Sequence, residues 1–315
     1  MTQKPTVGVA LFTLNGSKHL QYCLPPLLKS PLKPTVLVVD SSSTDDTVAV
    51  AQHLGAQTAV ISRKDFNHGL TREWARRHLR TDIVVMMTPD AYAVDEGMLG
   101  ILIDPIMKGD ASVAYARQIP HQGAGFFEAF PRQFNYPEKS QLRSIDDTKA
   151  YGVYTFFCSD SCAAYSNRAL NEIGGFKQVL LGEDTVAVAE LLRRGHKVAY
   201  VAEARVAHSH SYSLKQEFKR YFDTGLARST YGDLLACEAS DSQRGQQQVR
   251  ALMRELWKKK PLLIPYALIQ TACKWWGYRL GKWSTGAPIW WKQWLSAHPG
   301  YWTSSHYRSK VFKTK

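Results

Sequence analysis

The first 91 residues alternate between short apolar runs and segments with helical spacing, and this alternation constrains the fold more than any other feature. Each apolar run has the length of a buried strand and ends in polar, turn-forming residues. The predicted strands lie at 6–15, 34–47, 59–63 and 81–91. The range 34–47 includes the polar turn into which its strand runs. Strands that alternate with helices favour an α/β fold with a largely parallel sheet flanked by helices.

Two helices are expected between these strands. Residues 45–56 combine an acid-rich first turn with apolar spacing, and Gly55 is a typical stop signal. Residues 69–80 have helical character with a basic face. In open parallel sheets, ligands bind beside the carboxyl ends of the strands. The polar residues that follow the predicted strands are therefore candidates for a binding site.

The pattern is less regular after residue 111. The expected elements are a strand at 112–118, a mixed segment with turns at 121–147, and a strand, a loop and a helix start within 151–170. The stretch GEDTVAVAELLRRGHKVAYVAEARVAHSHSY then predicts a helix over about 184–194, stopped by Gly195, and a strand at 197–206. The 315 residues suit one large domain, alone or with a smaller appendage.

The C-terminal part of the chain differs in composition from the rest. Residues 242–315 contain 14 Lys or Arg and one acid, Glu255, so they carry the whole net charge of +13. They also contain eight of the nine tryptophans. This shift predicts a boundary near residues 237–248, which separates a domain at 1–236 from a basic helical region at 237–315.

The stretch 258–283 combines lysine, tryptophan and an apolar run of about a dozen residues, fewer than the roughly 20 that a membrane-spanning helix needs. Pro265 also interrupts this run. Tryptophan and lysine together are typical of a bilayer interface, so we predict peripheral contact with an anionic membrane. The alternative is a helical appendage whose tryptophans pack on the first domain while its lysines face solvent.

Other composition signals narrow the class of protein. The N-terminus lacks the charged head and apolar core of a signal peptide, and the five cysteines are scattered, which favours reduced thiols in the cytoplasm. Cys158 and Cys162 have no second pair at ligand spacing, which argues against structural zinc. Nucleic-acid binding would suit the basic C-terminal part but leaves the carboxylates of the first 241 residues, whose net charge is zero, unexplained.

Single acids follow two of the predicted strands. Asp40 ends the second strand, where a carboxylate can bind a base or ribose, or can cap the turn and the next helix. Asp90 follows the fourth strand, where it can hold a divalent cation against a diphosphate, or can simply form a turn. The residues alone leave both alternatives open.

The segment FNHGLTR at 66–72 brings polar groups to the start of a helix. Backbone amides at a helix N-terminus, together with Arg72, suit an anionic ligand. The alternative is a capping loop with a solvated arginine.

Glu183 and Asp184 stand together in the first turn of a predicted helix. The helix dipole favours an acid there, which explains one acid better than two. If Asp184 faces a cleft, it can act as a general base on a hydroxyl group. His208 and His210 alternate, so on an extended segment both point to one side, where a histidine can bind a metal or a phosphate. The alternative is an ordinary capped helix followed by two surface histidines.

The order of these motifs resembles that of inverting glycosyltransferases of family 2, which have the nucleotide-sugar-binding GT-A fold. A larger ordered set is similar to bacterial rhamnosyltransferases of that family: FNHGLTR, MMTPDA, YARQIP, FPRQFNYP, SDSCAAYSNRAL, IGGF, GED and HSHSYSLKQEFKRYFDTG. The similarity extends from residue 6 to about residue 226. The whole set carries it, since each motif alone is weak.

The resemblance implies a role for each matching position. The implied donor-binding residues are Thr13, Asn15, Asp40, Ser42, Asn67, His68, Gly69, Arg72, Asp90 and Ala91. Those on the acceptor side are Arg117, Gln118 and Arg132. Asp184 would be the general base, and Glu183 would orient it or the acceptor. Asp90 and His208 would hold Mg²⁺ or Mn²⁺; here Thr88 replaces the first acid of the family's Asp-x-Asp motif.

The resemblance also implies a reaction and a place for it. The chain would transfer L-rhamnose from dTDP-rhamnose to a lipid-linked surface polysaccharide, such as O-antigen, at the cytoplasmic face of a bacterial inner membrane. One alternative is the same chemistry with another nucleotide-sugar donor. Another is a non-catalytic module that binds a carbohydrate or a nucleotide.

Overall fold

The computed structural model describes residues 4–237 and 241–307. Within these residues, nine strands form one sheet in the order β3-β2-β1-β4-β8-β6-β9-β5, and β7 pairs with β9. The strands are β1 (Val7–Thr13), β2 (Thr35–Asp40), β3 (Gln57–Val60), β4 (Ile83–Met87), β5 (Tyr92–Ala93), β6 (Val113–Ile119), β7 (Gln141–Arg143), β8 (Cys162–Ser166) and β9 (Val198–Ala207).

The first four strands are parallel to one another, as the sequence predicts. The rest of the sheet is mixed, which corrects the expectation of a largely parallel sheet. β8 runs antiparallel to both β4 and β6, between which it lies, while β6 and β9 are parallel. The carboxyl ends of β1, β2 and β4 therefore meet at one edge.

Helices cover both faces of this sheet. They are α1 (Ser17–Leu28), α2 (Thr47–His53), α3 (His68–Leu79), α4 (Met98–Met107), α5 (Phe126–Asn135), α6 (Thr148–Tyr151), α7 (Asn167–Glu172) and α8 (Glu183–Leu192). Alternate residues of β1 enter two separate cores, because strand side chains alternate between faces. Val9 and Leu11 pack with residues of α1, α2 and α4, whereas Ala10 and Phe12 pack with residues of α3, α7 and α8.

One predicted strand is wrong. Residues 151–157 form the end of α6 and the 3₁₀ helix η3 (Gly152–Phe156). The fully buried Arg143 explains the difference, since its guanidinium donates hydrogen bonds to the carbonyl groups of Tyr154 and Phe157. The segment 151–157, which is rich in aromatic residues, therefore curves around the buried guanidinium of Arg143. The strand of this region is β8, where the sequence predicted a loop and a helix start.

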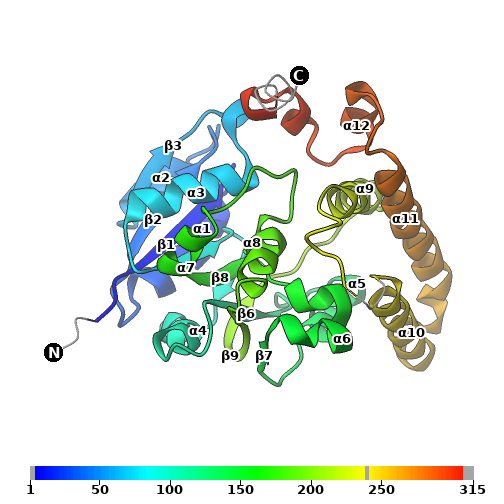
Figure 1. Cartoon of the computed structure of the whole chain (residues 1–315), viewed down its shortest axis with the longest axis horizontal. Helices are drawn as coiled ribbons and strands as arrows, with labels where there is room; N and C mark the ends of the chain where they lie inside the picture. Colours follow the sequence, from blue (N-terminus) through cyan, green and yellow to red (C-terminus); the bar gives the residue numbers. More distant parts are fainter. Residues whose placement is uncertain (1–3, 238–240, 308–315) are drawn as a thin grey trace.

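The C-terminal part forms helices that gather on one side of the molecule (Figure 1). They are α10 (Asp241–Lys259), α11 (Ile264–Trp283) and α12 (Ile289–Leu295), with the 3₁₀ helices η4 (Pro261–Leu263) and η5 (Pro299–Thr303). Helix α9 (Leu214–Thr230), which precedes the predicted boundary, lies beside them. None of the helices in the described ranges is long and apolar enough to span a bilayer.

Glycines bring α9 and α11 into close contact. A Cβ atom on Gly277 would lie 2.4 Å from the Phe218 carbonyl oxygen, and one on Gly281 would lie 2.0 Å from the Phe222 carbonyl oxygen. From the other helix, a Cβ on Gly225 would lie 2.1 Å from the Tyr278 carbonyl oxygen. The division of the chain into domains at 1–236 and 237–315 stays a prediction. Helix α9 belongs to the first of these ranges and packs against α11, which belongs to the second.

Candidate active site

The loops after β1 and β2 are joined by hydrogen bonds at the carboxyl edge of the sheet. The buried Asp40 carboxylate accepts a hydrogen bond from the Ser43 amide at 2.8 Å. Asn15 Oδ1 accepts one from the Thr44 amide at 2.9 Å, and the Asn15 amide donates to Ser43 Oγ at 2.7 Å. Asn15 and Ser42 have φ angles of 52° and 60°, a left-handed conformation that tight turns require. Asp40 thus holds a turn beside Ser42.

Thr13 ends β1 next to these loops. Its side chain is buried, and its Oγ1 has no hydrogen-bond partner within the described ranges. A buried hydroxyl without a partner is uncommon in folded proteins. Thr13 is therefore a candidate contact for a ligand bound at this edge.

The segment before α3 is fastened to residues 177–179. Asn67 caps the helix, because its Oδ1 accepts a hydrogen bond from the Leu70 amide at 3.1 Å. Its Nδ2 donates to the Val179 carbonyl oxygen at 2.8 Å. A Cβ on Gly69 would lie 1.7 Å from the Lys177 carbonyl oxygen, so only glycine allows this approach. Asn67 and Gly69 thus shape the loop that presents His68.

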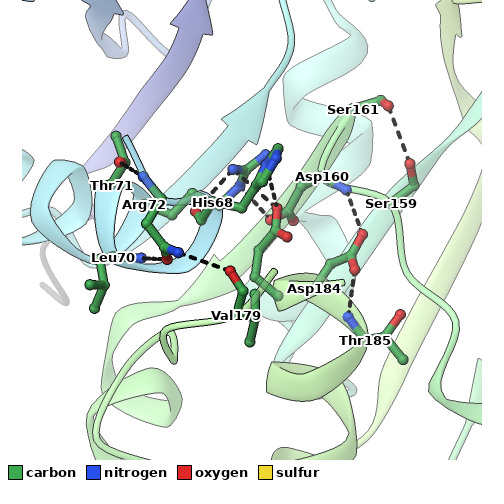
Figure 2. Close-up of polar contacts among 12 residues, drawn as sticks. His68, Leu70, Thr71, Arg72, Ser159, Asp160, Ser161, Val179, Asp184 and Thr185 are labelled. Carbon is green, nitrogen blue, oxygen red and sulfur yellow. Dashed lines mark hydrogen bonds and ion pairs between the residues drawn. The ribbon is translucent and has the colours of Figure 1, made fainter. Parts of the chain in front are cut away.

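Arg72 lies at the centre of a buried cluster of acids (Figure 2). Its Nε is 2.7 Å from Asp160 Oδ2, and its Nη1 is 3.0 Å from Glu183 Oε1. These two acids pair with the guanidinium that the resemblance assigned to donor binding. The sequence analysis missed Asp160, whose one signal was its place in the SDSC motif. Burial raises the pKa of Asp160, and Arg72 opposes that rise.

Asp184 lies beside this cluster, in the first turn of α8, and is partly exposed. Its Oδ1 accepts a hydrogen bond from the Thr185 amide at 2.6 Å, and its Oδ2 accepts one from the Asp160 amide at 3.3 Å (Figure 2). Burial raises the pKa of Asp184 to about 6, and the negative charge of Glu183 adds to the effect. A carboxylate with a pKa near the working pH is suited to general-base catalysis.

His68 lies at the edge of the same cluster. Its Nδ1 is 3.9 Å from Glu183 Oε1, and burial lowers the pKa of the imidazole to about 4. The ring is therefore neutral at neutral pH. It offers a polar group without adding charge.

A second cluster consists of Asp90, His208 and His210. Asp90 Oδ2 is 3.5 Å from His208 Nε2 and 3.3 Å from His210 Nε2, and the three ligand atoms lie within 4.8 Å of one another. The resemblance implied Asp90 and His208 as metal ligands, and the structure adds His210 to this group. The alternating spacing of the two histidines was the signal for this third group. Ala91, next to Asp90, is buried in the core.

Two predicted acceptor-side residues support the Asp90-His208-His210 cluster from behind. Gln118 Oε1 lies 2.8 Å from His208 Nδ1, and Arg132 Nε donates to the His208 carbonyl oxygen at 2.8 Å. A hydrogen bond at Nδ1 fixes the tautomer, so that the Nε2 lone pair points toward Asp90. Arg117 instead pairs with the exposed Glu138 at 2.9 Å.

The Asp90-His208-His210 cluster fits a divalent cation. A carboxylate oxygen and two imidazole nitrogens that lie within 4.8 Å of one another form a possible ligand set, and the Nε2 lone pair of His208 faces the carboxylate. Imidazole ligands suit Mn²⁺ better than Mg²⁺, which prefers oxygen ligands.

One loop links this cluster to the Arg72 cluster. Gln118 Nε2 donates to Ser159 Oγ at 2.8 Å, and the next residue, Asp160, contacts both Arg72 and Asp184. Asp184 and the candidate metal site thus flank the same loop. A separate cavity of about 650 Å³ lies between α4, β7 and β9, and none of the candidate residues lines it.

The fold defines the structural class of the protein: it is the GT-A fold of glycosyltransferases. A TarS fragment from S. aureus, in complex with UDP, aligns with a TM-score of 0.55 at 15% identity over 89% of this chain and 90% of that one. A mannosyltransferase from Pyrobaculum calidifontis, in complex with GDP-Man and Mn²⁺, aligns with a TM-score of 0.54 at 15% identity over 99% of this chain and 84% of that one.

The chain belongs to glycosyl transferase family 2, whose profile matches residues 9–174. It is 35% identical to the O-antigen chain rhamnosyltransferase WbaN of Salmonella anatum over 276 residues, which are 87% of this chain and 88% of that one. It is also 35% identical to the O-antigen chain rhamnosyltransferase RfbN of Salmonella typhimurium, with the same shares covered.

Proposed function

We propose that this enzyme transfers L-rhamnose from dTDP-rhamnose to a hydroxyl of a lipid-linked bacterial surface polysaccharide, with inversion at the anomeric carbon. The similarity to two O-antigen rhamnosyltransferases along most of the chain supports the sugar and the class of acceptor. The chemistry rests on one observation above all. Asp184, with its raised pKa, and the Asp90-His208-His210 cluster flank a single loop.

Asp184 is the proposed general base. Backbone amides of Thr185 and Asp160 orient its carboxylate, which accepts the proton of the acceptor hydroxyl. The hydroxyl oxygen bonds to the anomeric carbon as the bond from that carbon to the diphosphate oxygen breaks. Attack from the face opposite the leaving group inverts the configuration.

Glu183 has an indirect role in this proposal. Its carboxylate is engaged by Arg72, and its charge raises the pKa of Asp184. Glu183 therefore tunes the base, and the acceptor contacts Asp184.

Asp90, His208 and His210 would hold the divalent cation, with Gln118 fixing the orientation of His208. When bound, the cation supplies positive charge that stabilises the departing diphosphate. We place the nucleotide at the carboxyl edge of β1 and β2, where the candidate residues are Thr13, Asn15, Asp40 and Ser42.

Calorimetric titration of the full chain with a panel of donors tests the choice of donor. The panel comprises dTDP-rhamnose, UDP-glucose, UDP-galactose and GDP-mannose, each with Mn²⁺, with Mg²⁺ and with a chelator. The proposal predicts selective binding of dTDP-rhamnose, strengthened most by Mn²⁺ and lost in Asp90→Asn. Tighter binding of another nucleotide sugar would overturn the donor, and binding of none would contradict the enzyme assignment.

We also propose that the enzyme binds peripherally to the inner face of the bacterial plasma membrane. Large apolar side chains are exposed along the outer side of η4, α11 and α12, and we call this surface the aromatic face. Its residues are Leu262, Leu268, Ile269, Trp275, Trp276, Trp283, Ile289, Trp290 and Trp294. Trp283 and Trp294 are 66% and 67% exposed, so these two do not pack on the first domain, whereas the buried Trp302 packs with Leu180 of that domain.

Basic residues adjoin the aromatic face. Lys258 and Lys260 precede α11, and Arg279 and Lys282 lie exposed on it. Interfacial tryptophan with nearby cations is typical of a surface that binds anionic lipid, each cation contributing about 1 kcal/mol. The arrangement brings a water-soluble donor and a lipid-linked acceptor to the same enzyme.

Co-sedimentation with vesicles of phosphatidylcholine and phosphatidylglycerol tests this surface. The double variant Trp290→Ser/Trp294→Ser should bind at least about tenfold more weakly, because two interfacial rings are removed. Trp74→Ser is the matched control, since Trp74 is also exposed but lies on α3 of the first domain. Equal binding of the double variant and the control would exclude the aromatic face as the contact.

A further inference from the structure

The last described residues return to the first domain. We call residues 296–307 the return segment; it follows α12 and reaches the loop before α3 (Figure 1). Ser305 Oγ donates to Asp65 Oδ1 at 3.0 Å, and the buried Trp302 packs in a core with Leu180 and Phe222. The return segment is therefore anchored at both the helical part and the first domain.

The return segment carries a histidine that a buried acid holds in position. Asp223 on α9 is fully buried, and its Oδ2 lies 3.0 Å from His298 Nδ1. The same oxygen accepts a hydrogen bond from the Ala297 amide at 2.9 Å. These contacts fix the backbone and the ring together, and they direct the Nδ1 proton toward Asp223.

The other ring nitrogen of His298 remains available. Within the described ranges, His298 Nε2 has no hydrogen-bond partner, and the side chain is 34% exposed. A histidine oriented by a buried carboxylate, with one nitrogen left for a ligand, is an arrangement that binding and catalytic sites use.

His298 faces the buried cluster of Arg72, Asp160 and Glu183. Its ring packs edge-to-face against that of His68, with the centroids 5.1 Å apart. His68 in turn lies beside Glu183, which precedes the proposed base Asp184. The two imidazoles thus lie on the Glu183 side of the Arg72 cluster, and the proposed function places the diphosphate at the Asp90-His208-His210 cluster.

We propose that His298 is a donor-sugar-binding residue, whose Nε2 binds a hydroxyl of the transferred sugar, and that Asp223 is its positioning residue. The inference rests on the proposed function, because it takes the ligand to be a nucleotide sugar. A sugar bound through its diphosphate at the metal cluster extends toward the base, and so toward His68 and His298. Neighbouring imidazole edges and a free nitrogen suit a ligand that combines C–H faces with hydroxyl groups.

Paired titrations with dTDP-rhamnose and with dTDP, both in Mn²⁺, test the assignment. His298→Ala should weaken dTDP-rhamnose binding about tenfold, the value of one good hydrogen bond, and leave dTDP binding within about twofold. His298→Gln, which carries an amide near the position of Nε2, should recover part of the loss. Asp223→Asn should act in the same direction as His298→Ala. His53→Ala, on the exposed end of α2, is the control.

The outcomes separate this inference from the proposed function. If wild type binds dTDP but not dTDP-rhamnose, the proposed donor fails. If wild type binds dTDP-rhamnose and His298→Ala binds it equally well, His298 does not contact the sugar. Equal losses of affinity for dTDP and for dTDP-rhamnose in His298→Ala would make His298 a structural residue. If the variant instead showed only a higher KM for the acceptor in a turnover assay, His298 would belong to the acceptor site. Either result overturns the proposal.

Discussion

Acidification should switch the enzyme off through Asp184. The base must be ionised to accept a proton, and burial raises its pKa to about 6. Activity should therefore be complete above pH 7 and fall as the pH drops through 6. With a single ionisation at 6, about half of the molecules are active at pH 6 and about one in eleven at pH 5.

The assay is kcat/KM for the acceptor between pH 5 and pH 8, because at saturating donor this ratio reports ionisations of the enzyme–donor complex before the acceptor binds. Labelled dTDP-rhamnose and Mn²⁺ are kept saturating, and metal occupancy is checked at pH 5. The pKa values of His68 and His210 are both lowered to about 4, mainly by burial, so neither ring gains a proton over this range.

Glu183→Gln provides the second arm of the experiment. The charge of Glu183 helps to raise the pKa of Asp184, so its removal should move the midpoint of the profile to lower pH. A wild-type profile that is flat down to pH 5, or one with a midpoint near 4, the value of an ordinary aspartate, would refute the reasoning.

Two further predictions concern the metal site and the helical part. Gln118→Leu removes the partner of His208 Nδ1 and should weaken Mn²⁺ binding about 10- to 100-fold, measured by the EPR signal of free Mn²⁺, whereas Gln52→Leu on the surface should not. Gly281→Ala puts a Cβ 2.0 Å from the Phe222 carbonyl oxygen and should lower the free energy of unfolding by about 1–3 kcal/mol in urea. Gly286→Ala, with open space around it, is the control, and equal stability of the two variants would contradict the close packing of α9 and α11.

The sequence was most informative where local signals agree. The strands that became β1, β2 and β4 are apolar runs that end in polar turns, and this pattern alone brought Asp40 and Asp90 to one edge of the sheet. Gly195 marks the end of α8 as expected, and Asn67 caps α3 as in the alternative of a capping loop, because capping is a local interaction.

Long-range packing explains what the sequence analysis missed. The helices α1 and α4 contain Pro25, Pro26 and Pro105, which obscure a helical pattern, yet both helices are buried against the sheet. The partners of the site residues are also distant in sequence. Gln118 lies 90 residues before His208, the residue it orients.

The same limit applies to the acids. Asp160 contacts Arg72 from a loop 88 residues further along the chain, so no local pattern reveals the pair. The aromatic residues at 151–157 resemble a strand in the sequence. They curve instead, because the fully buried Arg143 donates hydrogen bonds to the carbonyl groups of Tyr154 and Phe157. Side chains that act across the fold were therefore visible only in three dimensions.

The most direct test of the account is the turnover of Asp184→Asn at saturating dTDP-rhamnose, with donor affinity measured on the same preparation. The amide keeps the size of the side chain but cannot accept the proton. The account predicts that turnover falls at least about a hundredfold, the lower end of the contribution of a general base, while donor affinity stays within a few-fold of wild type. Near-normal turnover in this variant would contradict the assignment of Asp184 as the base.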